Sequence, residues 1–283
     1  MAKIIDGKTI AKEFSEQIKK RVDEIKSRGI EPRIAMIRVG ENPASDKYIS
    51  VKEKLAAEVG ISSVVYKFGS VVKEREIADL IFQLNEDKKV HAILLQSPLP
   101  KNLQFRAFVN LIHPNKDVDG LTTINQGKLF SGEPGIAPCT PLGILHLLRT
   151  VCEDVAGRHA VVLGRSSIVG RPLAQLLLNA NCTVTLLHSY SKDLPEICRT
   201  ADILVSAVGK PLFVGKEFIK PGATVIDVGI NRIEQNGSSK IVGDVDFNDV
   251  FDVAEAITPV PNGVGPMTVA HLMHNTLKLA CYY

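Results

Sequence analysis

The first half of the chain alternates strand-like and helix-like segments, and this alternation limits the folds that the chain can adopt. Short apolar segments predict buried strands at residues 33–39, 61–68 and 90–96. Helices are predicted over residues 7–28, 43–59 and 73–85. The second of these helices has Asn42 as its N-cap, Pro43 at its first position and Gly60 just past its end. Strands that alternate with helices favour a parallel sheet covered by helices.

The second half repeats this pattern with four strand-like segments, HAVVLG, CTVTLLHS, ADILVSAVG and ATVIDVGIN. The ends of these segments are rich in Gly, Ser and Asn. A ligand lies across the carboxyl ends of the strands in an open parallel sheet, so these loops are expected to line one cleft. Further helices are predicted over residues 140–151, 171–179 and 266–283, whereas residues 113–141 up to the first of them form an irregular loop.

With 283 residues the chain is long enough for about two domains. We therefore predict an α/β protein made of two αβα domains with a cleft between them, the C-terminal one with a Rossmann-like, mostly parallel sheet. Lys and Arg number 34 against 31 Asp and Glu, a net charge of +3, which lacks the dense basic face that nucleic-acid binding requires.

The apolar runs also argue against a membrane protein, because runs such as residues 160–163 fall far short of the ~20 residues of a membrane-spanning helix. Charged residues begin at Lys3, so the N-terminus lacks the apolar core of a secretory signal and a cytoplasmic location is expected. The five cysteines form no CxxC pair, which argues against a disulfide framework and against a zinc site. No bound metal is expected.

The loop GRSSIVG is the first candidate site, because a glycine between a strand and a helix leaves backbone N–H groups pointing at a phosphate. The spacing of Gly164 and Gly170 matches neither GxGxxG nor a lysine-containing phosphate loop, so a tight turn without a ligand is the alternative. No acid ends the next strand. Arg165, Ser166 and Ser189 suit a 2′-phosphate, which favours NADP, unless the arginine is only a solvated residue at the start of a helix.

The first half offers a second group of candidates. Tyr48 and Lys52 are four residues apart on a predicted helix and share one face, where a ring and an amine suit a flat heterocycle. An ordinary charged helix surface is the alternative. Gln96 ends a buried strand, where it lines a cleft or caps the strand. The motif KDVDG supplies two carboxylates but no further ligands for calcium, and it also suits a simple turn.

The segments YISVK, LLQSPLP, KDVDGLT, PCTP, VVLGRSSIVGRP, VIDVGIN, VGDV and ITPVPNGVGPMTVAHL together closely resemble the bifunctional methylenetetrahydrofolate dehydrogenase/methenyltetrahydrofolate cyclohydrolase family. The resemblance implies oxidation of 5,10-methylenetetrahydrofolate to the methenyl form with NADP. It also implies hydrolysis of the methenyl form to 10-formyltetrahydrofolate. Such an enzyme serves one-carbon metabolism and purine biosynthesis, and the family is usually homodimeric.

The resemblance also assigns roles in the first half of the chain. Lys52 matches the catalytic lysine, and Tyr48 matches the aromatic residue that packs on the folate and helps to position that lysine. Gln96 matches the residue that hydrogen-bonds the lysine. Asp119 matches the acid that anchors the amino group and ring nitrogens of the pterin.

For the cofactor, the resemblance points to Gly164, Arg165, Ser166, Ser189 and Ile230, the last one near the nicotinamide. Residues 263–266, which include Gly263 and Pro266, match the loop beside the folate. The implied domains are residues 1–141 with 267–283 for folate and residues 142–266 for NADP. The chain departs from the family pattern at two positions, where Asn262 replaces a glycine and Ser97 a leucine.

Two other functions remain open from the sequence. One is a cyclohydrolase without dehydrogenase activity, against which the intact GRSSIVG loop argues. The other is a nucleotide-binding sensor without catalysis, in which Lys52 and Gln96 would be plain surface residues. An assay of methylene oxidation with NADP and NAD in parallel separates these possibilities.

Overall fold

The computed structural model describes residues 1–235 and 238–282 and divides the chain into two compact units. One unit, here called the three-strand unit, contains Lys12–Cys139 and Val269–Tyr283. The other, the six-strand unit, contains Met1–Ala11 and Thr140–Thr268. Neither unit is one continuous piece of the chain.

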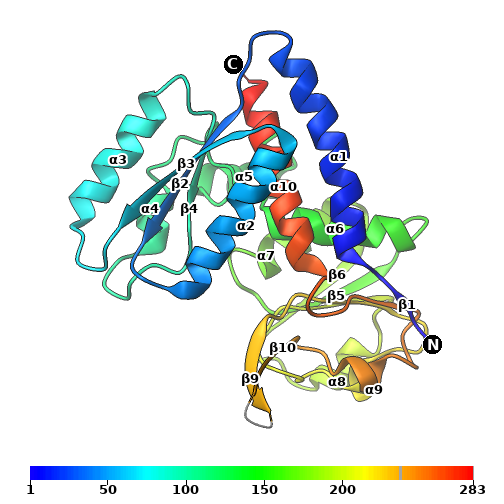
Figure 1. Ribbon diagram of the computed structural model, residues 1–283. Helices are drawn as coiled ribbons and strands as arrows, with labels where there is room; N and C mark the ends of the chain where they lie inside the picture. Colours follow the sequence, from blue (N-terminus) through cyan, green and yellow to red (C-terminus); the bar gives the residue numbers. More distant parts are fainter. Residues whose placement is uncertain (236–237, 283) are drawn as a thin grey trace. The chain divides into compact units, whose positions relative to one another are not determined.

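The three-strand unit is built on a parallel sheet with the order β3-β2-β4. Its strands are β2 (Arg33–Val39), β3 (Ser62–Phe68) and β4 (Ala92–Leu95). Its helices are α2 (Pro43–Val59), α3 (Glu74–Glu86), α4 (Phe105–Val109) and α5 (Thr123–Ser131), together with most of α1 (Gly7–Lys26) and α10 (Val264–Ala280). In Figure 1, α3 lies on one side of this sheet and α2 on the other.

Both faces of this sheet are buried, which explains why β2 is apolar throughout. Ile34 and Met36 pack in a cluster with residues of α1, α2 and α10. Ala35 and Ile37, which alternate with them, pack against Ile77 and other residues of α3 and α4. The sheet is therefore covered by helices on its two faces, and its strand ends remain for function.

The six-strand unit contains a wholly parallel sheet with the order β1-β11-β8-β7-β5-β6. Its strands are β1 (Lys3–Ile4), β5 (His159–Leu163), β6 (Thr183–Leu187), β7 (Ile203–Ser206), β8 (Thr224–Asp227) and β11 (Ala256–Ile257). A separate antiparallel hairpin joins β9 (Asn231–Gln235) and β10 (Ser238–Val242). The helical segments are α6 (Cys139–Val151), α7 (Gly170–Asn179), α8 (Leu194–Cys198), α9 (Phe247–Val250) and the 3-10 helix η1 (Lys216–Phe218). The predicted α/β class and the mostly parallel C-terminal sheet are confirmed.

The N-terminal segment differs from the bounds implied by the resemblance, which grouped residues 1–141 together. Met1–Ala11 belong to the six-strand unit, because Lys3 and Ile4 pair with Ala256 and Ile257 and add an edge strand to the sheet. The other boundaries, at Thr140 and Thr268, lie within two residues of those expected.

The predicted irregular loop also differs, because it contains the helix α5. Thr122 caps this helix by accepting a hydrogen bond from the backbone of Asn125, and Gly132 ends it with φ of 72°. The last helix begins at Val264, two residues earlier than predicted, and Tyr283 lies outside the described residues.

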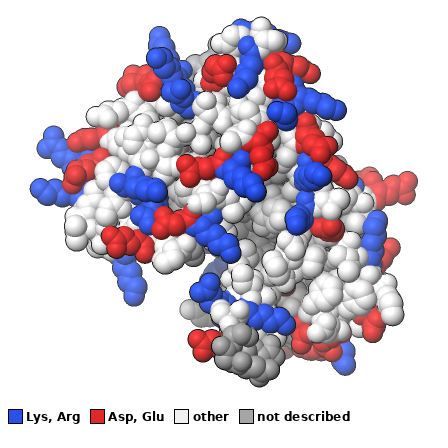
Figure 2. Space-filling model, in the orientation of Figure 1, with Lys and Arg blue, Asp and Glu red and all other residues white. Residues whose placement is uncertain are grey.

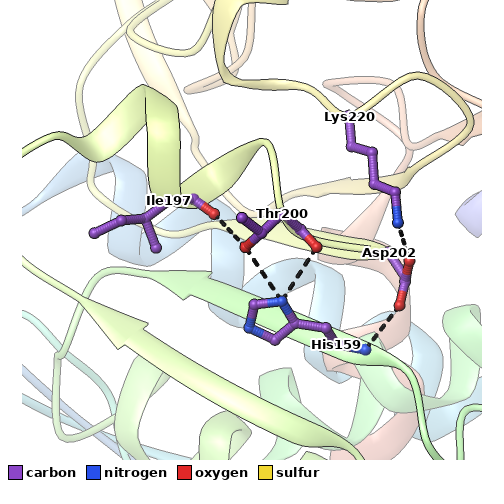
Figure 3. A network of polar contacts seen from close by, with 5 residues as sticks. All are labelled: His159, Ile197, Thr200, Asp202 and Lys220. Atoms are coloured by element: carbon purple, nitrogen blue, oxygen red, sulfur yellow. Dashed lines mark hydrogen bonds and ion pairs between the residues drawn. The ribbon is translucent and has the colours of Figure 1, made fainter.

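A polar network fastens the amino ends of β5 and β7 (Figure 3). The backbone N–H of His159 donates to Asp202, whose other carboxylate oxygen accepts from Lys220 at 2.6 Å. The His159 ring contacts Thr200, and its Nε2 lies 2.9 Å from Oγ1 of Thr185 in β6. The hydrogen bond from Lys220 lowers the pKa of Asp202. The polar groups at this edge of the sheet are thus used to hold neighbouring strands together.

Acidic and basic side chains are interspersed over the face shown in Figure 2. Some form exposed pairs one helical turn apart, such as Lys54 with Glu58 and Arg75 with Asp79. None of the described helices is long and apolar enough to cross a membrane. The same described residues include no cluster of three or more His, Cys, Asp or Glu side chains placed to hold a metal ion.

Candidate active site

A lysine and a glutamine from separate elements meet in the three-strand unit. Lys52, on α2, donates from Nζ to Oε1 of Gln96 at 2.8 Å. Gln96 follows β4, and its backbone N–H extends the sheet by donating to Ile37 O at 2.8 Å. Its Nε2 donates to Ser97 O at 2.6 Å, which turns Oε1 toward the lysine. The amide is therefore oriented as an acceptor for the ammonium group.

The two acids of KDVDG have different surroundings. The carboxylate of Asp117 accepts hydrogen bonds from Leu121 N and Thr122 N, at 3.2 and 2.8 Å, and closes the turn. Asp119 instead interacts electrostatically with Lys52 and hydrogen-bonds the thiol of Cys139. One acid thus forms the turn that the sequence allowed, and the other lies at the lysine.

Burial governs the charges of this group. Burial lowers the pKa of Lys52, while the negative charge of Asp119 partly opposes that change. Burial likewise raises the pKa of Asp119, and Lys52 opposes it. The pKa values of both groups are therefore shifted toward neutral pH relative to exposed side chains of the same types, a property that suits groups in a catalytic site.

Cys139 and Asn275 complete this group, and Asn275 was not singled out from the sequence. Cys139 is buried, and burial together with Asp119 raises its pKa well above the usual range, so the thiol stays protonated. Asn275, on α10, donates from Nδ2 to Val118 O and Ala137 O at 2.9 and 3.0 Å. It thereby connects the segment that carries Asp119 to the segment that carries Cys139. The sequence feature that could have indicated Asn275 is its position as a polar residue on the apolar face of the predicted last helix.

Tyr48 lies one turn before Lys52 on α2, and its side chain is 44% exposed. The spacing of four residues places the two side chains on the same face of the helix. Tyr48, Lys52, Gln96 and Asp119 all belong to the three-strand unit.

The glycine loop of the six-strand unit is packed too closely for side chains. A Cβ on Gly164 would lie 2.2 Å from Ala207 O, and one on Gly170 would lie 1.8 Å from Gly164 O. Oγ of Ser166 accepts from the backbone N–H groups of Val169 and Gly170 at 3.1 and 3.3 Å, which shapes the start of α7. A serine hydroxyl that accepts these bonds still has its own O–H to donate to a ligand.

The other cofactor candidates lie at the carboxyl ends of the strands of the six-strand unit. Arg165 follows β5 and Ser189 follows β6, and both are exposed. The pairing of Leu163 with Leu187 brings these two strand ends together. Ile230 follows β8 and is 54% exposed, as are Ile4 and Ile124 to a similar extent, so its exposure alone does not indicate a ligand.

Sequence reasoning missed two buried acids at this same edge. Asp244 is fully buried and accepts from the backbone N–H groups of Val208, Gly209 and Lys210, at 2.7 to 3.1 Å, and from the Asn231 side chain at 2.9 Å. Asp227, at the end of β8, accepts from the backbone of Gly229, Asp244 and Val245, each at 2.9 Å. These acids hold the loops after β7 and β8 in place. From the sequence, the motif VGDV contributed only to the family resemblance and did not indicate this structural role.

Gly263 and Pro266, the candidates for the loop beside the folate, belong to the six-strand unit at the start of α10. A Cβ on Gly263 would lie 2.5 Å from Pro259 O, so only glycine fits there. Asn262, one of the departures from the family pattern, has φ of 79°. Asn adopts this left-handed conformation more readily than most residues, so the loop keeps a backbone that glycine would also allow.

Comparison with known proteins identifies the chain. Models of the tetrahydrofolate dehydrogenase/cyclohydrolase catalytic domain and NAD(P)-binding domain match residues 5–119 and 138–283. The bifunctional protein FolD of Cereibacter sphaeroides is 51% identical over 281 residues, 99% of this chain and 95% of that protein.

Solved structures agree. The bifunctional FolD methylenetetrahydrofolate dehydrogenase/cyclohydrolase of Campylobacter jejuni superposes with a TM-score of 0.96 at 44% identity, covering 100% of this chain and 99% of that one. The Trypanosoma brucei enzyme, solved with NADP cofactor and an inhibitor, has a TM-score of 0.95 at 36% identity and covers 99% and 98%. The resemblance inferred from the sequence motifs is confirmed, and the chain belongs to the tetrahydrofolate dehydrogenase/cyclohydrolase family.

Proposed function

We propose that the chain oxidises 5,10-methylenetetrahydrofolate to the methenyl form with NADP and hydrolyses that product to 10-formyltetrahydrofolate. The observation that carries this proposal is the Lys52 ammonium, which lies 2.8 Å from Gln96 Oε1 and has a pKa lowered by burial. The names of the relatives support it, because they describe bifunctional enzymes, one of them bound to NADP.

The residues at the carboxyl edge of the six-strand unit fit NADP. The loop that starts at Gly164 leads from β5 into the N-terminus of α7, a position whose backbone N–H groups suit a pyrophosphate. Arg165 and Ser189 are exposed there, and the end of β6 has no acid to bind a ribose 2′-hydroxyl. This donor set favours a 2′-phosphate. We propose Gly164, Arg165, Ser166, Ser189 and Ile230 as the residues that hold the cofactor.

For the oxidation, NADP held by these residues would supply the acceptor for a hydride from the one-carbon unit of the folate. The residues of the chain bind the folate and orient it. Asp119 anchors the amino group and ring nitrogens of the pterin, Tyr48 packs on the folate, and Gly263 and Pro266 line its binding loop. Because the folate product is a delocalised cation, orientation supplies most of the rate enhancement and no strong base is required.

For the hydrolysis, water adds to the one-carbon atom of the methenyl cation and loses a proton. The bond to one ring nitrogen then breaks as that nitrogen gains a proton, and the hydroxyl of the adduct loses its proton as the formyl C=O bond forms, so one proton is released overall. Lys52 suits both transfers: its neutral amine accepts the proton from water, and the resulting ammonium returns one to the nitrogen. Gln96 holds the lysine and orients it. A cationic substrate beside it would lower the pKa of Lys52 further.

We further propose that the three-strand unit supplies the catalytic lysine and the pterin-anchoring acid, and that the six-strand unit binds NADP and supplies the loop with Gly263 and Pro266. A cytoplasmic homodimer that supplies formyl groups for purine biosynthesis is part of the same proposal. The free cysteines of the described chain suit a reducing compartment. Light scattering on the purified protein measures the oligomeric state, and a mass equal to one chain would contradict the dimer.

The test uses Lys52→Met with Lys54→Met as its matched control, since Lys54 lies on the same helix with its side chain 80% exposed. Formation and hydrolysis of methenyltetrahydrofolate are followed by absorbance, with NADP and NAD in parallel. We expect Lys52→Met to lose hydrolysis by about a hundredfold or more while NADP binding is kept, and Lys54→Met to match the wild type.

Full hydrolysis by Lys52→Met would refute the assigned role of the lysine. Hydrolysis by the wild type without methylene oxidation would indicate a cyclohydrolase that has lost the dehydrogenase. Neither activity, with NADP still bound, would indicate a nucleotide sensor.

A further inference from the structure

The loops that follow β5 and β6 bring an arginine and a tyrosine together. These two parallel strands pair through Leu163 and Leu187, and Gly164 N continues the pairing by donating to Leu187 O at 2.9 Å. The guanidinium carbon of Arg165 lies over the ring of Tyr190, 5.7 Å from its centroid. This distance is within the range of a cation–π contact.

Local hydrogen bonds fix the tyrosine. His188 N donates to Ser191 Oγ at 3.0 Å, and Tyr190 N donates to His188 Nδ1 at 3.2 Å, which closes a tight turn. The rings of His188 and Tyr190 meet edge to face with centroids 6.2 Å apart. Even so, Tyr190 is 81% exposed. Packing in the core therefore does not explain its position.

The arginine is available to an anion. Arg165 is exposed, and no carboxylate in the described part of the chain forms an ion pair with it. Its guanidinium carbon lies over the tyrosine ring, and the attraction of the cation to the ring uses none of the five N–H donors of the group. The contact with the ring is therefore compatible with bidentate binding of a phosphate.

We propose that Tyr190 is a positioning residue, whose ring holds the Arg165 guanidinium in place and so increases the preference of the site for a 2′-phosphate over a 2′-hydroxyl. The proposal rests on the proposed function, in which Arg165 binds that phosphate. A free arginine side chain loses rotamer freedom when it binds a ligand. The Arg165 side chain, in contact with the Tyr190 ring, has already lost part of this freedom. The resulting gain in affinity therefore appears only with cofactors that carry the 2′-phosphate.

The experiment measures KM and kcat for methylene oxidation with NADP. It also measures inhibition constants for 2′,5′-ADP and 5′-AMP, which differ only in the 2′-phosphate. The variants are Tyr190→Leu, Tyr190→Phe, Arg165→Ala and the double variant Tyr190→Leu/Arg165→Ala. Tyr282→Leu, at another exposed tyrosine in the three-strand unit, is the matched control.

We expect Tyr190→Leu to raise KM for NADP and the inhibition constant of 2′,5′-ADP by about two- to fivefold. The kcat and the inhibition constant of 5′-AMP should not change. Tyr190→Phe keeps the ring and should behave as the wild type, as should Tyr282→Leu. In the Arg165→Ala background, Tyr190→Leu should have no further effect.

Equal weakening of 2′,5′-ADP and 5′-AMP by Tyr190→Leu would overturn the proposal, because it would show the ring stacking on adenine instead. An unchanged affinity for 2′,5′-ADP, or the same loss in the Arg165→Ala background, would also overturn it. If Arg165→Ala itself leaves the preference for 2′,5′-ADP unchanged, the assigned phosphate site is wrong. That outcome is distinct from a failure of the tyrosine alone.

Discussion

Each unit contains an aspartate at the carboxyl edge of its parallel sheet, buried in one unit and half-buried in the other, and the two have opposite surroundings. In the six-strand unit, Asp244 accepts four short hydrogen bonds, three of them from consecutive backbone N–H groups. In the three-strand unit, Asp119 interacts with three ionisable side chains, Lys52, Cys139 and Asp117, and burial raises its pKa. The same residue type therefore holds loops in one unit and, in the function proposed above, binds the substrate in the other.

The donors explain the difference. Fixed backbone N–H groups stabilise a carboxylate and use up its acceptor capacity, so such an acid shapes loops. An acid that faces a lysine and a thiol keeps acceptor capacity for a ligand, and its charge responds to that ligand. Substitutions at the two sites should therefore separate loss of stability from loss of activity.

The largest effect is expected for Asp244→Ala. This change leaves several buried backbone donors without an acceptor, each at about 1 to 3 kcal/mol, so the free energy of unfolding should fall by about 4 kcal/mol or more. Urea unfolding measures it. The exposed Asp252→Ala in the same unit should change stability by less than about 0.5 kcal/mol. If Asp244→Ala lowered the free energy of unfolding by as little as Asp252→Ala, Asp244 would not have the structural role that the comparison assigns to it.

The next effect concerns pH. Burial raises the pKa of Asp227 from 3.8 to about 6. Since the folded pKa exceeds the unfolded one, the folded chain holds this proton more tightly. The contribution of Asp227 to stability is therefore greatest below about pH 4 and falls by about 3 kcal/mol as the pH rises to about 6.

Asp227→Asn removes this titration. The free energy of unfolding of the wild type, relative to this variant, should therefore decrease over the same pH window, as measured by urea unfolding at several pH values. A relative stability that rises with pH would show that the backbone donors, rather than burial, dominate at Asp227.

Asp119→Ala tests the chemical side. We expect KM for methylenetetrahydrofolate to rise by about tenfold to a hundredfold, since an ionic hydrogen bond to the pterin is lost. The melting temperature should not fall, because the change removes a half-buried acid whose pKa is raised by desolvation. The neighbouring Asp117→Ala is the contrast and should lower the melting temperature, because it leaves two backbone donors of the turn unpaired. Unchanged folate kinetics in Asp119→Ala would contradict the anchoring role.

The smallest effect is expected for Gln96→Glu. A carboxylate in place of the amide should raise the pKa of Lys52, moving the corresponding limb of the hydrolysis pH–rate profile to higher pH by about one pH unit. Gln96→Leu removes the acceptor of the ammonium and should move that limb to lower pH. A pH–rate profile that is unchanged in both variants would show that Gln96 does not control the pKa of Lys52.

Local patterns were sufficient to predict part of the site. The spacing of Tyr48 and Lys52 placed them on one helix face, and the position of Gln96 at a strand end placed it at the functional edge of the sheet. The resemblance, rather than any pattern, selected Asp119 over Asp117. Their different roles depend on hydrogen bonds within the turn and on the position of Cys139, 20 residues further along the chain.

Other features were beyond local patterns. The strands β1 and β11 have two residues each, too short for any periodicity, and they exist because they pair with each other. The helix α5 lies in a segment whose Gly and Pro content predicts a loop. Asp244 gave no sign of its role, because its donors come from a loop more than 30 residues earlier and are brought there by the fold.

The final helix, α10, has a consequence for how the protein is made. Leu272, Met273 and Leu277 of this helix belong to the core of the three-strand unit, whose sheet is synthesised much earlier. While the ribosome translates the intervening Thr140–Thr268, that sheet lacks part of its cover and presents apolar surface, a state prone to aggregation and to chaperone binding. Folding of the three-strand unit therefore depends on a helix that is translated only after the whole intervening segment.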